Sequence, residues 1–138
     1  MPRSVLAVFV LLAGCGSTVP EPVTAQQPPT IYAPVPYPPP AAFVELVPKA
    51  PNKEAVWIDG SWTWHGVRYV WRRGGWVKPP AGGHYAPWKI SYRTDGTVWF
   101  APAGWFDQNG RKLSDPDVIV SAGTPANELT SEEMQSGQ

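Results

Sequence analysis

All eight tryptophans of this 138-residue chain lie between Trp57 and Trp105. The same stretch is dense in Gly and Pro and has no 3.6-residue apolar period, so helices are not expected there. Aromatic and β-branched side chains favour strands, and each buried indole removes about 150–250 Å² from water. The sequence therefore predicts an all-β domain at residues 52–122 with a core built largely of tryptophan.

Three turn signals divide this domain into three hairpins, each read here as a two-residue loop. They are His65-Gly66, Asp95-Gly96 and Asn109-Gly110. The strand pairs that follow from these loops are Trp64 with Val67, Trp62 with Tyr69, Tyr92 with Trp99, Ile90 with Ala101, and Phe106 with Leu113.

Each predicted hairpin has one apolar face and one more polar face, and a lone hairpin is marginal in water. The apolar face of the first would carry Trp62, Trp64, Val67, Tyr69 and Trp71; that of the second would carry Trp88, Ile90, Tyr92 and Trp99. We therefore expect a small antiparallel meander that closes into a sandwich or an open barrel.

A short repeat spaces these tryptophans. Residues 57–62 and residues 71–76 both read W-x-x-G-x-W, and residues 99–105 look like a third copy with one residue inserted. The motif positions are Trp57, Gly60, Trp62, Trp71, Gly74, Trp76, Trp99, Gly104 and Trp105. Glycine permits a positive φ or a close backbone approach, so we expect a bend there with Trp on either side as a clamp.

The repeat resembles the YXWGXW (WXXGXW) family of exported bacterial proteins, and Tyr69-Val70-Trp71 strengthens the match. The resemblance covers about Val56 to Phe106. It implies export and a small β repeat module, and it brings no catalytic residues.

The first fifteen residues predict export. Val5–Ala13 is a nine-residue apolar run, too short for a membrane span and typical of a signal-peptide core. It leads into Leu12-Ala13-Gly14-Cys15, which resembles the bacterial lipobox. We expect a signal peptide at residues 1–14 and palmitate-type acyl chains on Cys15; the alternative is an ordinary secretory signal. Gly16 in place of Asp favours the outer membrane over the inner one.

A proline-rich segment, residues 15–51, follows the predicted lipid anchor. Eleven of the 18 prolines lie between Pro20 and Pro51. Polyproline geometry predicts a disordered tether that could reach on the order of 110 Å and hold the domain off the bilayer. Residues 32–37 could instead be a docking peptide, and residues 41–47 could add an edge strand. The polar tail at residues 123–138 is expected to fray.

Some tryptophans could serve binding instead of the core. A core of about 70 residues rarely holds eight Trp, so we expect some at the surface, where their faces would stack on sugar rings. Trp76, Trp88, Trp105 and Tyr85 are the predicted platform for peptidoglycan or another glycan. The alternative is that all of these rings are structural.

The sequence offers little for catalysis. His65 falls in a predicted turn, His84 has no identifiable partner, and no metal-ligand spacing or nucleophile motif is present. The formal net charge of zero gives no reason to expect nucleic-acid binding. We expect a non-enzymatic lipoprotein of the cell envelope that needs no cofactor. The alternatives are a cell-wall hydrolase using His84 and nearby Asp residues, or a subunit of a larger envelope assembly. Whether the protein faces the periplasm or the cell surface is left open by the sequence.

Overall fold

The computed structural model describes residues 18–123, so the predicted signal peptide, Cys15 and the tail beyond residue 123 lie outside the described residues. The described chain is all-β, as the sequence predicted, with one 3-10 turn. Its elements are η1 Pro29–Ile31, β1 Ala33–Val35, β2 Val56–Ile58, β3 Ser61–Trp64, β4 Tyr69–Arg72, β5 Gly75–Val77, β6 His84–Ala86, β7 Lys89–Tyr92, β8 Val98–Ala101, β9 Gly104–Phe106, β10 Lys112–Leu113 and β11 Val118–Ser121.

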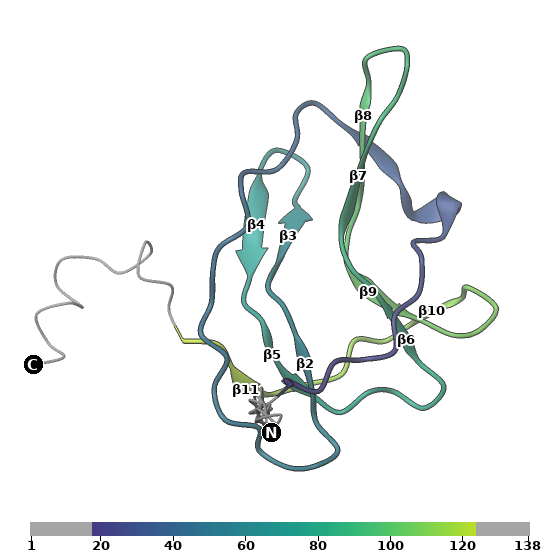
Figure 1. The fold of residues 1–138 in the computed structure, drawn as a ribbon. Helices are drawn as coiled ribbons and strands as arrows, with labels where there is room; N and C mark the ends of the chain where they lie inside the picture. The colour runs from purple at the N-terminus through teal and green to yellow at the C-terminus, as the bar shows by residue number, and fades with distance from the viewer. Residues whose placement is uncertain (1–17, 124–138) are drawn as a thin grey trace, which may run out of the picture.

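The strands form four antiparallel sheets, with orders β1-β8-β7, β10-β9-β6, β11-β5-β2 and β3-β4. Two long, bent hairpins generate this arrangement (Figure 1). The first hairpin, residues 56–77, pairs β2 with β5 and β3 with β4 in one continuous register. The second hairpin, residues 84–106, does the same with β6–β9 and β7–β8. Each hairpin is interrupted once, at a bend between its two pairs of strands.

The two hairpins face each other and enclose one aromatic cluster between them; a second cluster joins the first hairpin to Ala55 and Ala122 and contains no residue of the second hairpin. In the half near their tips, Trp62, Phe100 and Val35 are buried, and the rings of Tyr69 and Phe100 lie 5.3 Å apart. In the half near their ends, the buried tryptophans Trp57 and Trp76 pack in a second cluster. The fold is thus sandwich-like, with a core of aromatic rings in both halves.

The predicted pairing of the first hairpin is wrong by two residues. Trp64 pairs with Tyr69, and the loop is centred on Gly66 and Val67 instead of His65 and Gly66. Gly66 has a φ of +83° at the first loop position, a conformation that glycine adopts without strain. A two-residue shift keeps every side chain on its predicted face, because the period of a strand is two. Only Val67 leaves the core face; it is 80% exposed in the loop.

The predicted pairings of the other two hairpins are wrong by one residue. Their loops have three residues, ending on Gly96 and Gly110 with φ of +85° and +78°. This is the type I turn with a glycine bulge, which competes with the two-residue turn for the same Asp-Gly and Asn-Gly sequences. A shift of one residue exchanges the faces of the sheet. Phe100 therefore occupies the core position that the sequence assigned to Trp99.

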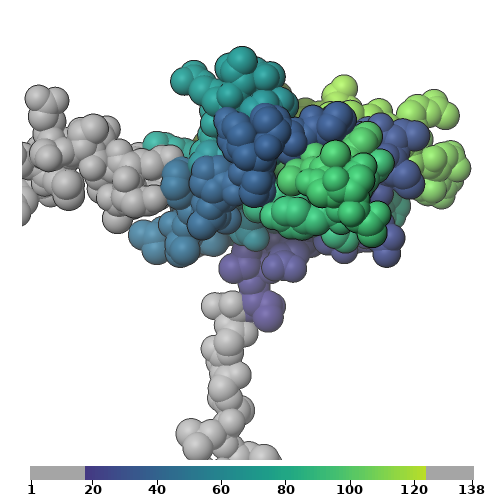
Figure 2. All heavy atoms as spheres, turned by 90° about the horizontal axis from the view of Figure 1, so that it is seen from above, coloured from purple at the N-terminus to yellow at the C-terminus, as the bar shows by residue number. Residues whose placement is uncertain are grey.

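The prediction of a disordered tether is wrong for the part that the structure describes. Residues 20–48, which we call the strap, pack along both hairpins. β1 pairs with β8, and the backbone of Val23 and Ala25 bonds to that of Tyr85. Viewed down on the hairpin tips, the blue strap lies between the teal first hairpin and the green second hairpin (Figure 2). A proline-rich segment cannot pack on itself, but here the hairpins supply the partners for its carbonyls and rings.

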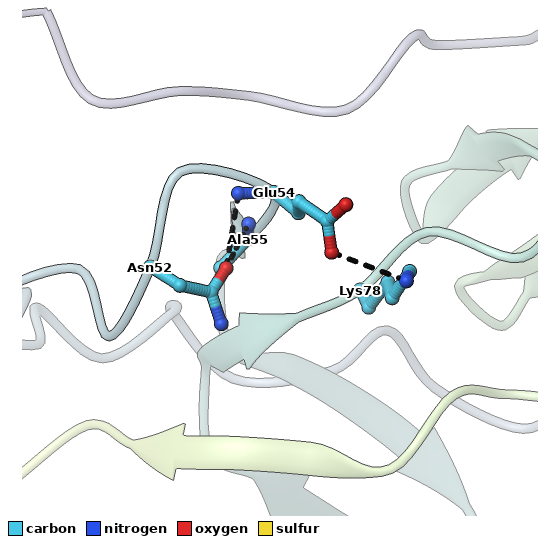
Figure 3. A network of polar contacts seen from close by, with 4 residues as sticks. All are labelled: Asn52, Glu54, Ala55 and Lys78. Carbon is cyan, nitrogen blue, oxygen red and sulfur yellow. Dashed lines mark hydrogen bonds and ion pairs between the residues drawn. The ribbon is translucent and has the colours of Figure 1, made fainter.

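The stretch expected as an edge strand, residues 41–47, forms no strand and pairs with none among the described residues, so that prediction is wrong. It attaches through side chains instead. The Phe43 ring lies 5.2 Å from that of Trp62 and 4.9 Å from that of Trp71. The strap then leads into a turn where the Asn52 side chain accepts hydrogen bonds from the backbone of Glu54 and Ala55 (Figure 3).

We predict that Phe43→Ala lowers the free energy of unfolding by about 2–3 kcal/mol, because it removes a ring packed between two indoles. Urea unfolding followed by tryptophan fluorescence measures this. Val44→Ala, on the neighbouring exposed residue, is the matched control and should change stability little. Equal, small effects of both substitutions would mean that the strap does not pack on the domain.

Candidate functional site

The W-x-x-G-x-W segments cross the bends of the first hairpin. Trp57 pairs with Trp76 on one side of the bend, and Trp62 pairs with Trp71 on the other. The rings meet edge to face, with centroids 5.6 Å and 5.0 Å apart. The glycine of each motif lies between these pairs, so the clamp predicted from the sequence is present.

The two motif glycines allow close approach and not a positive φ. A Cβ on Gly60 would lie 2.3 Å from Cζ2 of Trp71, and a Cβ on Gly74 would lie 2.6 Å from the carbonyl oxygen of Ile58. Neither glycine is among those with positive φ. The structure therefore supports close backbone approach, and not a positive φ, as the role of Gly60 and Gly74.

The second hairpin also has a pair of large side chains on each side of its bend, although its sequence does not show the full motif. Tyr85 pairs with Trp105 where the first hairpin pairs two tryptophans, and Ile90 pairs with Phe100. By position in the hairpin, Phe100 and Trp105 therefore correspond to Trp71 and Trp76, and Ala103 stands where the motif has its glycine. Trp99 lies under the Arg93 guanidinium, whose Cζ is 3.5 Å from the ring centroid.

The strap secures the bend of the first hairpin with a carboxylate. Glu45 accepts a hydrogen bond from the Trp71 indole at 2.9 Å and another from the Gly74 amide at 2.8 Å. Its Oε2 would lie 2.6 Å from a Cβ on Gly60. The glycines of the repeat thus make room for the Glu45 carboxylate as well as for the indole.

The strap secures the second bend with an amide. Gln27 Nε2 donates to the carbonyl oxygens of Ala86, Pro87 and Pro102, at 3.2, 2.7 and 2.8 Å. The prolines have no amide hydrogen to donate, so this bend presents acceptors where the first bend presents donors. The strap thus places an acceptor, Glu45, at the first bend and a donor, Gln27, at the second.

The predicted platform divides into two pairs. Trp76 and Trp105 are each only 2% exposed, so the prediction that they form a binding surface is wrong. They are the ends of the clamps, and the Trp76 indole donates to the carbonyl of Pro48 at 2.7 Å. Trp88 and Tyr85 are half-buried and line surface hollows. Gly and Pro beside a Trp were therefore signs of a bend and not of exposure.

Two hollows with shared walls form the candidate binding groove. Both are lined by Asp59, Gly60 and Trp88, and they have volumes of about 200 and 340 Å³. The strap supplies the walls on both sides: Glu21, Pro22 and Thr24 line one hollow, and Ala42, Phe43, Val44 and Glu45 line the other. Trp88 takes the place in the second hairpin that Gly60 takes in the first. The groove therefore combines an indole with several carboxylates at the junction of the two bends.

A smaller, polar cavity lies beside the groove. Its volume of about 30 Å³ has room for one or two water molecules. Arg72 and Asp115 form an ion pair across it at 2.9 Å, and Tyr85 contributes to its wall. Burial raises the pKa of the Tyr85 hydroxyl, with Asp115 and Asp59 adding to the rise against the effect of Arg72. Tyr85 is therefore a neutral hydrogen-bonding group in this wall.

The two histidines lie away from the groove. His65 is exposed beside the first hairpin loop, as expected, and His84 is half-buried in β6. His84 lines a separate hollow with Asp107, whose carboxylate accepts hydrogen bonds from the backbone of Asn109 and Arg111. Within residues 18–123, no three His, Cys, Asp or Glu side chains are placed to hold a metal ion.

Comparison with known proteins adds no assignment, because no family model, curated protein or solved structure matches the chain. The candidate groove therefore stands on its geometry. Among the described residues, no helix is long and apolar enough to cross a membrane.

We predict that Gln27→Glu lowers the free energy of unfolding at neutral pH by about 2 kcal/mol, because it turns a carboxylate toward carbonyl oxygens and removes their donor. Urea unfolding at pH 7 tests this. Gln26→Glu makes the same chemical change on the exposed neighbour and is the control. An equally small loss for the two variants would rule out the bonds of Gln27 to the second bend as a significant source of stability.

Proposed function

We propose that this chain is a non-enzymatic lipoprotein of the cell envelope, displayed from the outer membrane, and that it binds peptidoglycan or a related glycan in the groove at Trp88. The observation that carries the binding proposal is the half-buried indole of Trp88 beside the exposed carboxylate of Asp59. The other tryptophans with buried rings serve the fold.

The chemistry of the groove suits a sugar chain. The face of an indole packs against the apolar C–H face of a sugar ring, and its polar rim stays wet. Carboxylates accept hydrogen bonds from hydroxyl groups, and such charge-assisted bonds are stronger than neutral ones. Asp59 Oδ1 already accepts a bond from the Trp57 indole at 2.8 Å, which fixes its carboxylate at the groove wall. Glu21 and Thr24 add further polar groups.

The groove is also preformed by the fold. Trp88 packs near Phe100 in the core, with ring centroids 6.3 Å apart, and Glu45 is fixed by its two bonds to the first hairpin. Side chains that are ordered before binding lose less conformational entropy when a ligand arrives. This favours recognition of a ligand over an exclusively structural use of these residues.

Trp88→Ala is expected to weaken binding to purified peptidoglycan about tenfold, roughly 1–2 kcal/mol, through loss of the stacking surface. Co-sedimentation with the polymer, together with tryptophan fluorescence titrated with a soluble N-acetylglucosamine oligosaccharide, measures the change. Trp99→Ala is the control, because that half-buried Trp lies on the other face of the second hairpin.

Asp59→Asn provides a second test that keeps the acceptor for Trp57 and removes only the charge. It should weaken glycan binding while leaving the unfolding midpoint nearly unchanged. If the unaltered protein shows neither retention on peptidoglycan nor a spectral change with the oligosaccharide, the glycan proposal is wrong.

The anchoring proposal has its own test. Mass spectrometry of the mature protein should find Cys15 as the first residue, carrying a diacylglyceryl thioether and an acylated amino group, because two or more chains are needed for stable anchoring. Cys15→Ser should abolish this product. A mature chain with a free thiol, or one that starts at another residue, would contradict the proposal.

A further inference from the structure

Because the strap packs on the domain, only a short linker, residues 15–20, separates the proposed lipid from the domain. The carbonyl of Pro20 accepts a hydrogen bond from the Trp57 amide at 2.8 Å, so the chain is already attached at this residue. From Cys15 to Pro20 a fully extended backbone spans at most about 18 Å. The long spacer expected from the proline content is therefore replaced by five residues, and a lipid on Cys15 would hold this end of the domain at the headgroup layer.

Both ends of the strap meet at the paired residues Trp57 and Trp76. Pro20 bonds to Trp57, and the carbonyl of Pro48 accepts the Trp76 indole at 2.7 Å. The two rings are 5.6 Å apart. In Figure 1 the first described residues lie beside β2 and β5, at the end of the molecule opposite the tips of the hairpins. The last residues of the strap, near Pro48, therefore lie at the same end of the domain as Pro20, where the linker is attached.

The outward side of these residues is apolar. Phe43 and Glu45 contact the first hairpin and are half-buried, whereas the residues that alternate with them are exposed. Val44 is 89% exposed and Leu46 is 85% exposed. Val47 and Val19 are also exposed. Such a group of large apolar side chains on one edge indicates a contact surface more than a chance arrangement.

The same edge carries two lysines, and one acid, Glu21, is exposed beside Pro20. Lys49 and Lys53 follow the apolar residues and are exposed. The acid nearest to them in sequence, Glu54, forms an ion pair with Lys78 at 3.1 Å and is thereby neutralised (Figure 3). Apolar side chains with lysines at their margin suit the interface of a bilayer that contains anionic lipids.

We propose that this anchor edge, formed by Val19, Val44, Leu46, Val47, Lys49 and Lys53, lies on the surface of an anionic lipid bilayer. The inference rests on the proposed lipidation of Cys15, which brings the edge within reach of the membrane. The lipid supplies attachment, and the anchor edge sets the orientation of the domain. Because Val44 also lines the groove, the glycan site opens near the membrane and not at the end of a long stalk.

The test uses the full, acylated chain in vesicles of phosphatidylethanolamine and phosphatidylglycerol. Cys15 is the only cysteine and is acylated in this form, so Leu46→Cys introduces a single free thiol for an environment-sensitive fluorophore. Thr94→Cys, in the exposed loop at the tip of the second hairpin, is the matched control. A nitroxide-bearing lipid should quench the label at residue 46 severalfold more strongly than the label at residue 94.

Charge reversal examines the basic part of the edge. In the Leu46→Cys protein, Lys49→Glu with Lys53→Glu should reduce this quenching, and Lys112→Glu, on an exposed lysine of β10, should not. Equal quenching at residues 46 and 94 in acylated protein would overturn the anchor edge and leave the lipoprotein proposal intact. Labelling at Cys15 itself would show an unacylated thiol and would overturn both.

Discussion

The arrangement of the whole domain depends on how the strap bonds to the two bends. Each hairpin interrupts its strand pairing once, and an interrupted pairing leaves backbone groups that need partners. At the first bend Glu45 accepts from the Gly74 amide and from the nearby Trp71 indole, while the Gly74 carbonyl accepts from the Ala122 amide. At the second bend Pro87 and Pro102 leave carbonyls, and the Gln27 amide donates to them. One continuous segment thus joins both hairpins by matching the hydrogen-bonding sense of each bend.

The sequence was sufficient for the fold class and for the three hairpin tips, because turn glycines and aromatic strands are local signals. It was not sufficient for the registers. Asp-Gly and Asn-Gly suit both two-residue and three-residue loops, and the choice depends on contacts beyond the turn. The predicted register was wrong by two residues at the Gly66 loop, which left each paired side chain on its predicted face of the sheet. It was wrong by one residue at the Gly96 loop, which placed Trp99 in the core instead of Phe100. The same slip explains why the sequence began the third copy at Trp99 although Phe100 is the residue equivalent to Trp71.

The candidate site was predicted only in part, since it depends on contacts between distant residues. Trp88 and Tyr85 do line the groove, but Trp76 and Trp105 are buried, and nothing local to a tryptophan distinguishes these outcomes. The strap was missed for a related reason. Its composition correctly indicates that it cannot fold alone, yet Gln27 bonds to a carbonyl 75 residues away. Neither Gln27, which follows another glutamine, nor Glu45 shows in its local sequence any sign of such a partner.

The position of the strap also links properties that a flexible tether would keep apart. It supplies both walls of the groove, the exposed side chains of the anchor edge and the residues that bond to the bends. A change in the strap that released Glu45 would therefore widen the groove and weaken the first bend in one step. By contrast, Val44 and Leu46 are exposed and take no part in those bonds, so their exchange leaves the bonds unchanged. The side chains that stabilise the fold and those of the proposed membrane contact thus alternate along residues 43–46.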